Sequence, residues 1–320
     1  MSVDQYAQLY DQFKDIMTLN EPMADHTTWR IGGPADVFAR PQTIDQLQEL
    51  IIAAKREQVP FYLIGKGSNL LISDEGIRGI VIQLNGQFER MTFNDDQLLV
   101  YAAKGMVAAA YNAMAHGLSG LEFATGIPGS IGGAVAMNAG AHGREIRDVL
   151  TYADLLTRDG ERIRLSKEEL GFSYRHSLIK ENGWIVLSAS FRLEPGDAQA
   201  MQETAKSWAR RRSATQPLSL PSCGSVFRNP QGDFAARLIE AAGLKGKRIG
   251  MAQISEKHAN FIVNLGDAKA SEVAALIQLV RETIAEREGI LLYPEVKMMG
   301  DFEYGGGADG QIDRARGTSS

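Results

Sequence analysis

Three polar residues of this 320-residue sequence lie in surroundings that suit charge or proton transfer. Arg175 lies in a polar run between apolar segments, Ser225 follows a glycine, and Glu295 stands between a proline and a valine in an apolar stretch. Because an unpaired buried charge is costly, a carboxylate in such a stretch is either functional or paired with a nearby cation. The serine is equally compatible with ordinary turn chemistry. Together the three residues offer a fixed cation, a hydroxyl proton donor and a carboxylate.

Other kinds of catalytic chemistry find no matching pattern. The five histidines show no paired metal-ligand spacing, so a catalytic metal site is not expected. The nucleophile motif G-x-S-x-G does not occur. The single cysteine, Cys223, excludes an internal disulfide framework. We expect it to be a small buried residue, since a thiol nucleophile needs a lowered pKa.

Two glycine-rich segments are the next feature. The first, Gly65–Leu70, begins G-x-G after an apolar run, but leucine stands where a dinucleotide-binding fingerprint needs its third glycine. A phosphate-binding G-x-x-x-x-G-K-[ST] loop is also absent from the sequence. What remains is a turn whose backbone N–H groups can approach a phosphate, or a plain connection between two strands.

The second segment, Glu122–Ala134 continued by Met137–Ala141, has little side chain to bury. A long flexible linker is one interpretation. Linkers are polar, however, whereas Ile127, Ile131 and Val135 need burial. A packed, glycine-rich backbone with apolar anchors fits a surface laid against a planar or phosphorylated cofactor.

Apolar periodicity predicts the elements that position these residues. Helices are expected at Asp4–Met17, from Thr43 with the stripe Ile44, Leu47, Leu50, Ile51 and Ala54, at Met106–His116, Ala198–Arg212 and Phe234–Ala242, and from a cap at Ser271 to Gly289. Strands or extended segments are expected at Val59–Ile64, Leu70–Ile72, Gly79–Leu84, Leu98–Ala102, Val149–Leu156, Arg162–Leu165, Trp184–Phe191, Phe261–Asn264, Ile290–Tyr293 and Val296–Met299. An Asp-Gly pair at Asp159 predicts a tight hairpin.

Composition limits the class of protein. The chain has 34 basic and 39 acidic residues and a net charge of −5, which disfavours a nucleic-acid binder. No apolar run long enough to span a membrane occurs, and the N-terminus lacks the pattern of a signal peptide, so a cytoplasmic protein is expected. We expect units at 1–85, 86–197 and 198–302, followed by a disordered tail at 303–320.

Six motifs in order carry a family resemblance: Thr28–Asp36, Gly65–Leu71, Gly126–Gly133 with Met137–Gly140, Ser173–Arg175, Gly224–Phe227 and Pro294–Val296. The chain resembles the UDP-N-acetylenolpyruvoylglucosamine reductases (UDP-N-acetylmuramate dehydrogenases), bacterial flavoenzymes of peptidoglycan precursor synthesis. Only fifty positions separate Arg175 from Ser225, which resembles the short form of the family without its extra tyrosine loop.

The resemblance implies an α+β fold. Two subdomains would form the FAD-binding fold of the vanillyl-alcohol oxidase (PCMH) type, and a C-terminal α+β domain would bind substrate. It also implies that NADPH reduces noncovalently bound FAD, which reduces the enolpyruvyl ether of UDP-N-acetylglucosamine-enolpyruvate to UDP-N-acetylmuramate. Partners would be the UDP-sugar and NADPH, with no nucleic acid or membrane; a monomer is expected.

By the same resemblance Arg175, Ser225 and Glu295 are the catalytic residues. Arg175 would stabilise the charge of an enolate, with Glu295 as a hydrogen-bond partner, and Ser225 would supply the closing proton. The implied cofactor contacts are Gly65, Lys66, Gly67, Ser68, Asn69, Thr125, Gly126, Ile127, Pro128, Gly129, Gly132, Gly133, Asn138 and Gly140. The substrate contacts expected are Tyr174, Arg212, Asn229, Lys245 and His258.

Two other functions stay open at this stage. The chain is compatible with a different flavin-dependent oxidoreductase on the same fold, although an oxidase would not need a proton donor for an enolate. It is also compatible with a flavin-free sugar-nucleotide binding protein, which would be colourless when purified.

Overall fold

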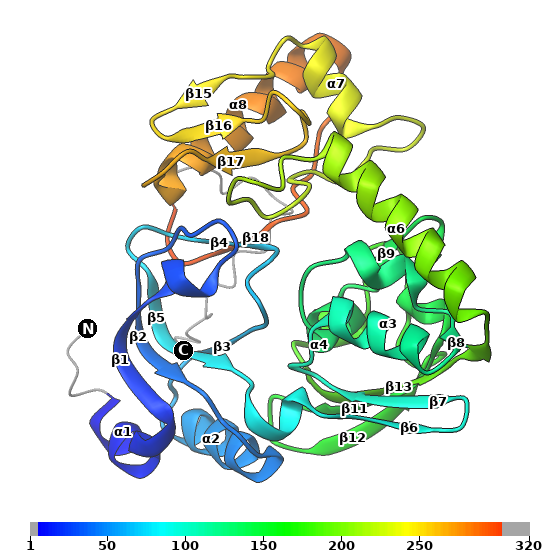
Figure 1. Cartoon of the computed structure of the whole chain (residues 1–320). Helices are drawn as coiled ribbons and strands as arrows, with labels where there is room; N and C mark the ends of the chain where they lie inside the picture. The colour runs from blue at the N-terminus through cyan, green and yellow to red at the C-terminus, as the bar shows by residue number, and fades with distance from the viewer. Residues whose placement is uncertain (1–5, 303–320) are drawn as a thin grey trace. The chain divides into compact units, whose positions relative to one another are not determined.

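The computed structural model describes residues 6–302, which form two compact units (Figure 1). Within the described residues the first unit comprises the chain up to Thr18, Phe38–Lys66 and Ile80–Arg212. The second comprises Leu19–Val37, Gly67–Gly79 and the chain from Ser213 onward. The tail predicted at 303–320 and the first residues of the predicted N-terminal helix lie outside the described residues.

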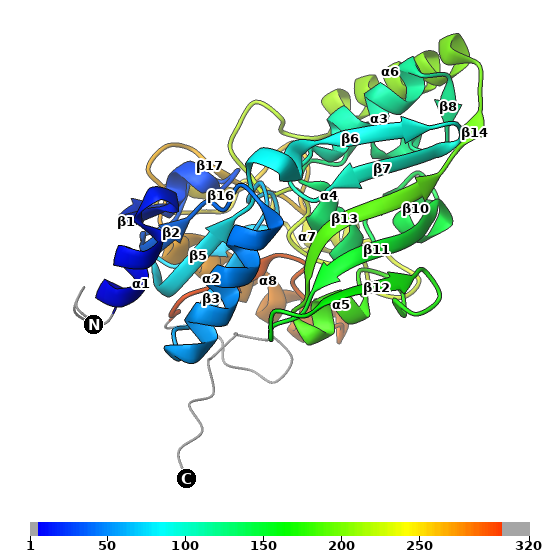
Figure 2. The same ribbon diagram turned by 90° about the horizontal axis from the view of Figure 1, so that it is seen from below.

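The first unit is built on a five-stranded antiparallel sheet of strand order β12-β11-β13-β7-β6. Figure 2 shows the strands side by side in this order. Their bounds are β6 Met91–Asn94, β7 Gln97–Tyr101, β11 Leu150–Leu156, β12 Arg162–Ser166 and β13 Ile185–Arg192. The hairpin predicted at Asp159 is confirmed, since Leu156 pairs with Arg162. Strand β6 was not predicted, because it is short and half exposed.

Helices cover one face of this sheet (Figure 1). They are α3 Met106–Ala115, as predicted, and the short α4 Ile131–Ala136, which packs on β13. The other elements of this part of the chain are β8 Leu118–Ser119, η5 Glu122–Gly126, β9 Gly140–Ala141, β10 Arg144–Glu145, η6 Ile146–Asp148, α5 Leu178–Asn182, β14 Glu194–Pro195 and the predicted long helix α6 Ala198–Thr215.

A second sheet has the strand order β1-β2-β5-β3. Its strands are β1 Met17–Pro22, β2 Pro34–Ala39, β3 Phe61–Ile64 and β5 Ile77–Gln83. Strands β3 and β5 run parallel and were predicted, whereas β1 and β2 were missed because each contains a proline and lacks a sustained apolar run. The associated helices are α1 Ala7–Phe13, η2 Lys14–Ile16, η3 Met23–His26, α2 Ile44–Arg56 and η4 Gly86–Glu89.

Helix α2 begins as its sequence predicts. The hydroxyl of Thr43 accepts a hydrogen bond from the N–H of Gln46 at 3.1 Å, which satisfies one unpaired donor of the first turn. Its apolar stripe is buried from Leu47 to Ala54. A short α1 replaces the longer predicted helix, because the chain has already turned into β1 at Met17.

The second unit contains a three-stranded antiparallel sheet, β15-β16-β17, and two helices. Their bounds are α7 Ala235–Ala241, β15 Arg248–Ile249, β16 Ala252–Ile254, β17 Ile262–Asn264 and α8 Ala270–Glu288. The predicted stripe of α8, from Val273 to Ile284, is buried in the core. Trp29 is fully buried in the same core, and its indole N–H donates to the carbonyl of Ile262 at 2.7 Å.

The predicted cap of α8 is wrong. Ser271 lies inside the helix, which begins at Ala270. The carboxylate of Asp74 accepts hydrogen bonds from the N–H groups of Ala270, at 2.7 Å, and Ser271, at 3.0 Å. A carboxylate suits a helix N-terminus because it pairs free donors and faces the positive end of the helix dipole.

Strand β4, Leu70–Ile72, pairs in parallel with β18, Lys297–Met299. Both extended segments were predicted, but their pairing was not, because more than two hundred residues separate them. No helix among residues 6–302 has the length and apolar character needed to cross a membrane.

Candidate active site

The first glycine-rich turn approaches the second within the first unit. A Cβ atom on Gly65 would lie 2.5 Å from the Oγ atom of Ser130, so only glycine allows this spacing. The carbonyl of Gly65 accepts a hydrogen bond from the side-chain amide of Gln83 at 2.9 Å, which fixes the end of β3. The two segments expected to bind one cofactor are therefore in contact, through the backbone of Gly65 and the side chain of Ser130.

The second glycine-rich segment is an ordered helical structure, not a linker. Ser130 caps α4 by accepting from the N–H of Gly133 at 3.3 Å. A Cβ on Gly132 would lie 3.1 Å from Cβ of Ala102, so the glycine allows α4 to pack closely on the sheet. Ile131 and Val135 are fully buried, as their apolar character required. The helix was missed because glycine is a poor helix former.

The rest of the first turn packs within the second unit. Gly67 has φ +64°, and a Cβ there would lie 2.7 Å from Cα of Thr27. The carbonyl of Gly67 accepts from the N–H of Thr28 at 3.2 Å. The motif that contains Thr28 therefore supports the glycine-rich turn at Gly67, so two of the six family motifs contact each other.

Arg212, expected to contact substrate, lies against the second glycine-rich segment. Its guanidinium donates to the carbonyl of Gly126. Burial lowers the pKa of Arg212, although a guanidinium stays charged at neutral pH. In the same segment the hydroxyl of Thr125 donates to the carbonyl of Glu122 at 2.7 Å.

Arg175 lies at the tip of a tight turn. Ser173 and His176 exchange backbone hydrogen bonds of 3.2 and 3.1 Å, and Arg175 between them has the left-handed φ of +57°. Its guanidinium donates to the carbonyl of Gly140 at 3.3 Å and lies 5.0 Å from the ring centroid of exposed Tyr174. The turn thus holds the cation beside a predicted cofactor residue.

Ser225 and Glu295 lie on two paired segments of the second unit. The N–H of Glu295 donates to the carbonyl of Val226 at 2.7 Å, and Phe227 pairs with Pro294 as an antiparallel bridge. Ser225 is exposed, whereas Glu295 is partly buried. Residues seventy positions apart in the sequence are thereby brought onto neighbouring backbone segments.

Cys223 is a buried residue, as expected, with 5% of its surface exposed. Burial raises the pKa of its thiol far above the ordinary range, and the negative charge of Glu295 raises it further. The thiol is therefore neutral at physiological pH, which argues against a nucleophilic role.

Two asparagines fix these segments. Buried Asn260 donates from its amide to the carbonyl of Phe227 at 2.8 Å, and its Oδ1 accepts from the N–H of Phe227 at 2.9 Å. The amide of Asn69 donates to the carbonyl of Glu295 at 3.1 Å, and its own carbonyl accepts from the N–H of Lys297 at 3.0 Å. Asn260 escaped the sequence analysis because its role depends on tertiary contacts.

The remaining predicted substrate residues are spread over the second unit. Asn229 accepts from the N–H of Ala235 at 3.1 Å, at the start of α7. The ammonium of Lys245 pairs with Glu240 at 3.0 Å. Burial lowers the pKa of His258, and the positive charge of Lys245 also lowers it, against raising effects of a backbone hydrogen bond and of Glu240, each smaller than the effect of burial. Lys245 and His258 are thus electrostatic neighbours.

Arg228, next to Asn229, was not selected from the sequence. Its Nε is a buried side-chain nitrogen without a hydrogen-bond partner, the only one of its kind among residues 6–302. An unsatisfied buried donor calls for an explanation, and a bound anion would satisfy it. The signal available in the sequence was its place three positions after Ser225.

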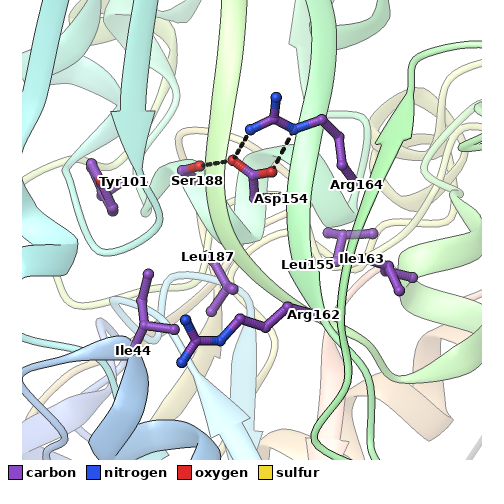
Figure 3. A pocket seen from close by; sticks show the side chains of 9 residues that line it. All are labelled: Ile44, Tyr101, Asp154, Leu155, Arg162, Ile163, Arg164, Leu187 and Ser188. Carbon is purple, nitrogen blue, oxygen red and sulfur yellow. Dashed lines mark hydrogen bonds and ion pairs between the residues drawn. The ribbon is translucent and has the colours of Figure 1, made fainter.

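One pocket of about 320 Å³ lies elsewhere in the first unit (Figure 3). The carboxylate of Asp154, in the wall of the pocket, accepts hydrogen bonds from Ser188 at 2.8 Å and from Arg164 at 2.7 Å, so this carboxylate is already paired. It contains none of the predicted site residues. In the described part of the chain no three His, Cys, Asp or Glu residues are grouped as metal ligands.

The chain is an α+β protein, and the match of its N-terminal part to an FAD-binding domain makes it a flavoprotein. Residues 35–166 match the domain family described as FAD binding domain, and residues 216–299 match the C-terminal domain of UDP-N-acetylenolpyruvoylglucosamine reductase. The chain belongs to the UDP-N-acetylenolpyruvoylglucosamine reductase family, as its motifs predicted.

Curated relatives and a solved structure agree. The chain is 48% identical to the reductase of Latilactobacillus sakei, over 88% of this chain and 92% of the relative. It is 45% identical to that of Alkaliphilus oremlandii, over 90% and 95%. The crystal structure of the Thermus caldophilus reductase matches with a TM-score of 0.76 and 36% identity, over 88% and 97%. The predicted fold class is therefore confirmed.

Proposed function

We propose that Arg175, Ser225 and Glu295 are the residues with which this chain performs the reaction of its family. The chain is an FAD-dependent oxidoreductase that uses NADPH to reduce the enolpyruvyl ether of UDP-N-acetylglucosamine-enolpyruvate to UDP-N-acetylmuramate, a step of peptidoglycan precursor synthesis. Pairing between the Ser225 and Glu295 segments carries the proposal, because it unites two of the three residues in one place.

The residues fit the flavin chemistry. FAD supplies hydride transfer from NADPH to the methylene carbon of the enolpyruvyl group. Negative charge then develops on the neighbouring carbon and its carboxylate. Arg175 stabilises this charge, since a guanidinium remains cationic and binds carboxylates through two N–H groups. Its position at the tip of a held turn limits the reorganisation that stabilisation requires.

Ser225 donates the proton that completes the lactyl ether. A serine hydroxyl is a weak acid, so donation requires close placement and a strongly basic acceptor, which an enolate is. Donation leaves an alkoxide on Ser225, and Glu295, on the paired segment, would pass a proton from solvent back to that oxygen. Cys223 stays neutral beside Glu295 and adds no competing charge.

The FAD pyrophosphate and ribityl chain would lie on the two glycine-rich segments. Close approach of Gly65 to the buried side chain of Ser130 brings the bare backbone of the two segments together. The expected contacts named above from Gly65 to Asn69, from Thr125 to Gly133 and at Gly140 belong to this proposal. The side chain of Asn138 is left out of it, because it is fully buried and its polar groups are all occupied within the protein. FAD is noncovalent, because neither segment carries a cysteine or histidine at its centre.

The UDP-sugar would be held by basic and amide groups. Arg212, Asn229, Lys245 and His258 remain proposed contacts, with Tyr174 beside Arg175. Arg228 joins them, because a phosphate oxygen would satisfy its unpartnered Nε. The proposal also includes three expectations from the sequence: domain boundaries at residues 85 and 197, a monomeric state and a cytoplasmic location. UDP-sugars and NADPH occur in the cytoplasm.

A visible spectrum followed by NADPH oxidation tests this function. The purified protein should be yellow, and acid precipitation should release all of the flavin into the supernatant. NADPH should bleach the flavin, and the enolpyruvyl sugar nucleotide should restore the colour without oxygen. A colourless protein would support a flavin-free binding protein. Bleaching without recovery would indicate a different flavoenzyme.

A further inference from the structure

Asn138 is a buried residue directly after α4, with none of its surface exposed. Its side chain uses every polar group. The amide nitrogen donates to Oε2 of Glu145 at 2.9 Å and to the carbonyl of Ser173 at 3.1 Å. Oδ1 accepts from the N–H of Arg147 at 3.1 Å. This one amide therefore links α4, the β9–β10 hairpin with its following turn, and the turn that bears Arg175.

The same turn is held at its other end. The hydroxyl of buried Ser177 donates to the carbonyl of Ala136 at 2.6 Å, and it also accepts from the N–H of Lys180 at the start of α5. Residues 173 and 177 are thus both attached to the segment 136–138. Arg175 lies between the two attachments and donates to Gly140 in the same segment.

A backbone with positive φ needs such external support. Non-glycine residues with φ near +57° are strained and persist where the surroundings fix them. Both Arg175 and Asn138 adopt this conformation, at φ +57° and +43°. Loss of the Asn138 amide would leave the carbonyl of Ser173 only its hydrogen bond from the N–H of His176 within the turn, and would release that end of the turn from the segment 136–138.

We propose that the side chain of Asn138 is a positioning residue for Arg175. It holds the turn 173–176 on the glycine-rich segment, so that the guanidinium is already in place when charge develops on the substrate. The inference rests on the proposed role of Arg175. Asn138 itself does not touch the reacting atoms in this scheme.

Asn138→Asp is the first test. The carboxylate keeps the size of the side chain, tolerates positive φ and accepts from Arg147, but it can donate neither to Ser173 nor to Glu145. Flavin reduction by NADPH, measured per bound flavin, should stay within about twofold. Reoxidation by the enolpyruvyl substrate should slow by about 10- to 100-fold, as expected for a displaced catalytic group. Asn182→Asp, at an exposed amide that bonds within α5, is the matched control.

A second variant covers failure of the first to fold. Asn138→Gly allows the left-handed backbone without strain and removes the amide. It should give the same selective loss. In an Arg175→Ala background neither substitution should slow reoxidation further, because residues acting through one group are non-additive.

Several results would overturn the inference. Equal losses in both half-reactions, or losses that follow flavin content alone, would make Asn138 merely structural. Multiplicative losses with Arg175→Ala would separate the two residues. If Arg175→Ala leaves reoxidation unchanged, the proposed function fails, and this inference fails with it. If Arg175→Ala slows reoxidation but the Asn138 variants reoxidise normally, only this inference is refuted.

Discussion

At the scale of residues, the structure gives the three proposed catalytic groups different surroundings. Ser225 is exposed on a paired segment, Glu295 is partly buried, and Arg175 is held in a strained turn. The sequence singled out each residue by its local motif, and the family resemblance gave it a role. What holds each one was not, since the supporting amides of Asn69, Asn138 and Asn260 act through partners distant in sequence.

Ser225→Ala should separate the two half-reactions. Reduction of the flavin by NADPH does not use this hydroxyl and should be unchanged. Reoxidation by substrate should slow by at least about 10²-fold, the lower range for loss of a general acid. Stopped-flow absorbance of the flavin measures both steps. Ser219→Ala, at an exposed serine of the same unit, is the control. Equal losses in the two steps would contradict a proton-donor role.

Cys223 should make stability fall at high pH. Burial holds the pKa of the thiol in the folded protein above its ordinary value of about 8.5. The buried neutral thiol therefore contributes fully to the free energy of unfolding below about pH 8.5. Above about pH 8.5 this contribution is lost, because the thiol ionises in the unfolded chain. By pH 10 this loss is about 2 kcal/mol. Urea unfolding at pH 8 and 10 should show it in the natural sequence and not in Cys223→Ala. Identical pH dependence in both would refute it.

At the scale of elements, glycine decides the geometry of the second segment. The sequence showed that its apolar residues needed burial, and Ile131 and Val135 are buried. It did not show a helix, because two of the six residues of α4 are glycines. Contact between Gly132 and the sheet requires one of them, which is a tertiary constraint overriding local propensity.

Gly65→Ala should weaken flavin binding. A Cβ at 2.5 Å from the Oγ of Ser130 must displace that hydroxyl and disturb the cap of α4. Loss of a cap destabilises by about 0.5–2 kcal/mol. Flavin retention on dialysis and the melting temperature should both fall. The double variant Gly65→Ala/Ser130→Ala relieves the overlap and should retain more flavin than Gly65→Ala. If it retains less, the overlap is not the cause.

Asp74→Ala should destabilise the second unit. The carboxylate pairs two N–H groups at the start of α8, and removing such a cap costs about 0.5–2 kcal/mol. Asp74→Asn should cost less, since the amide oxygen still accepts one hydrogen bond. Neighbouring Glu75 is exposed, so Glu75→Ala is the control. Urea unfolding measures all three, and equal stabilities would exclude a capping role.

At the scale of the whole molecule, discontinuous segments build each unit. Trp29 belongs to the core of the second unit although it precedes most of the first, and its indole bonds a strand more than two hundred residues away. Domain boundaries assigned along the sequence take no account of such returns. One example is the N–H of Thr28, which donates to the carbonyl of Gly67, a residue about forty positions later in the chain.

The sequence by itself determined the family, the cofactor and most regular elements. Motifs keep their order, the apolar periodicity of α2 and α8 is local, and so is the Thr43 cap of α2. Tertiary structure alone decided the cap of α8 by Asp74, the pairing of β4 with β18, the helical form of α4, and the anchoring of Arg175 by Asn138. Each of these depends on hydrogen bonds or close contacts between residues distant in the chain, and no local pattern encodes them.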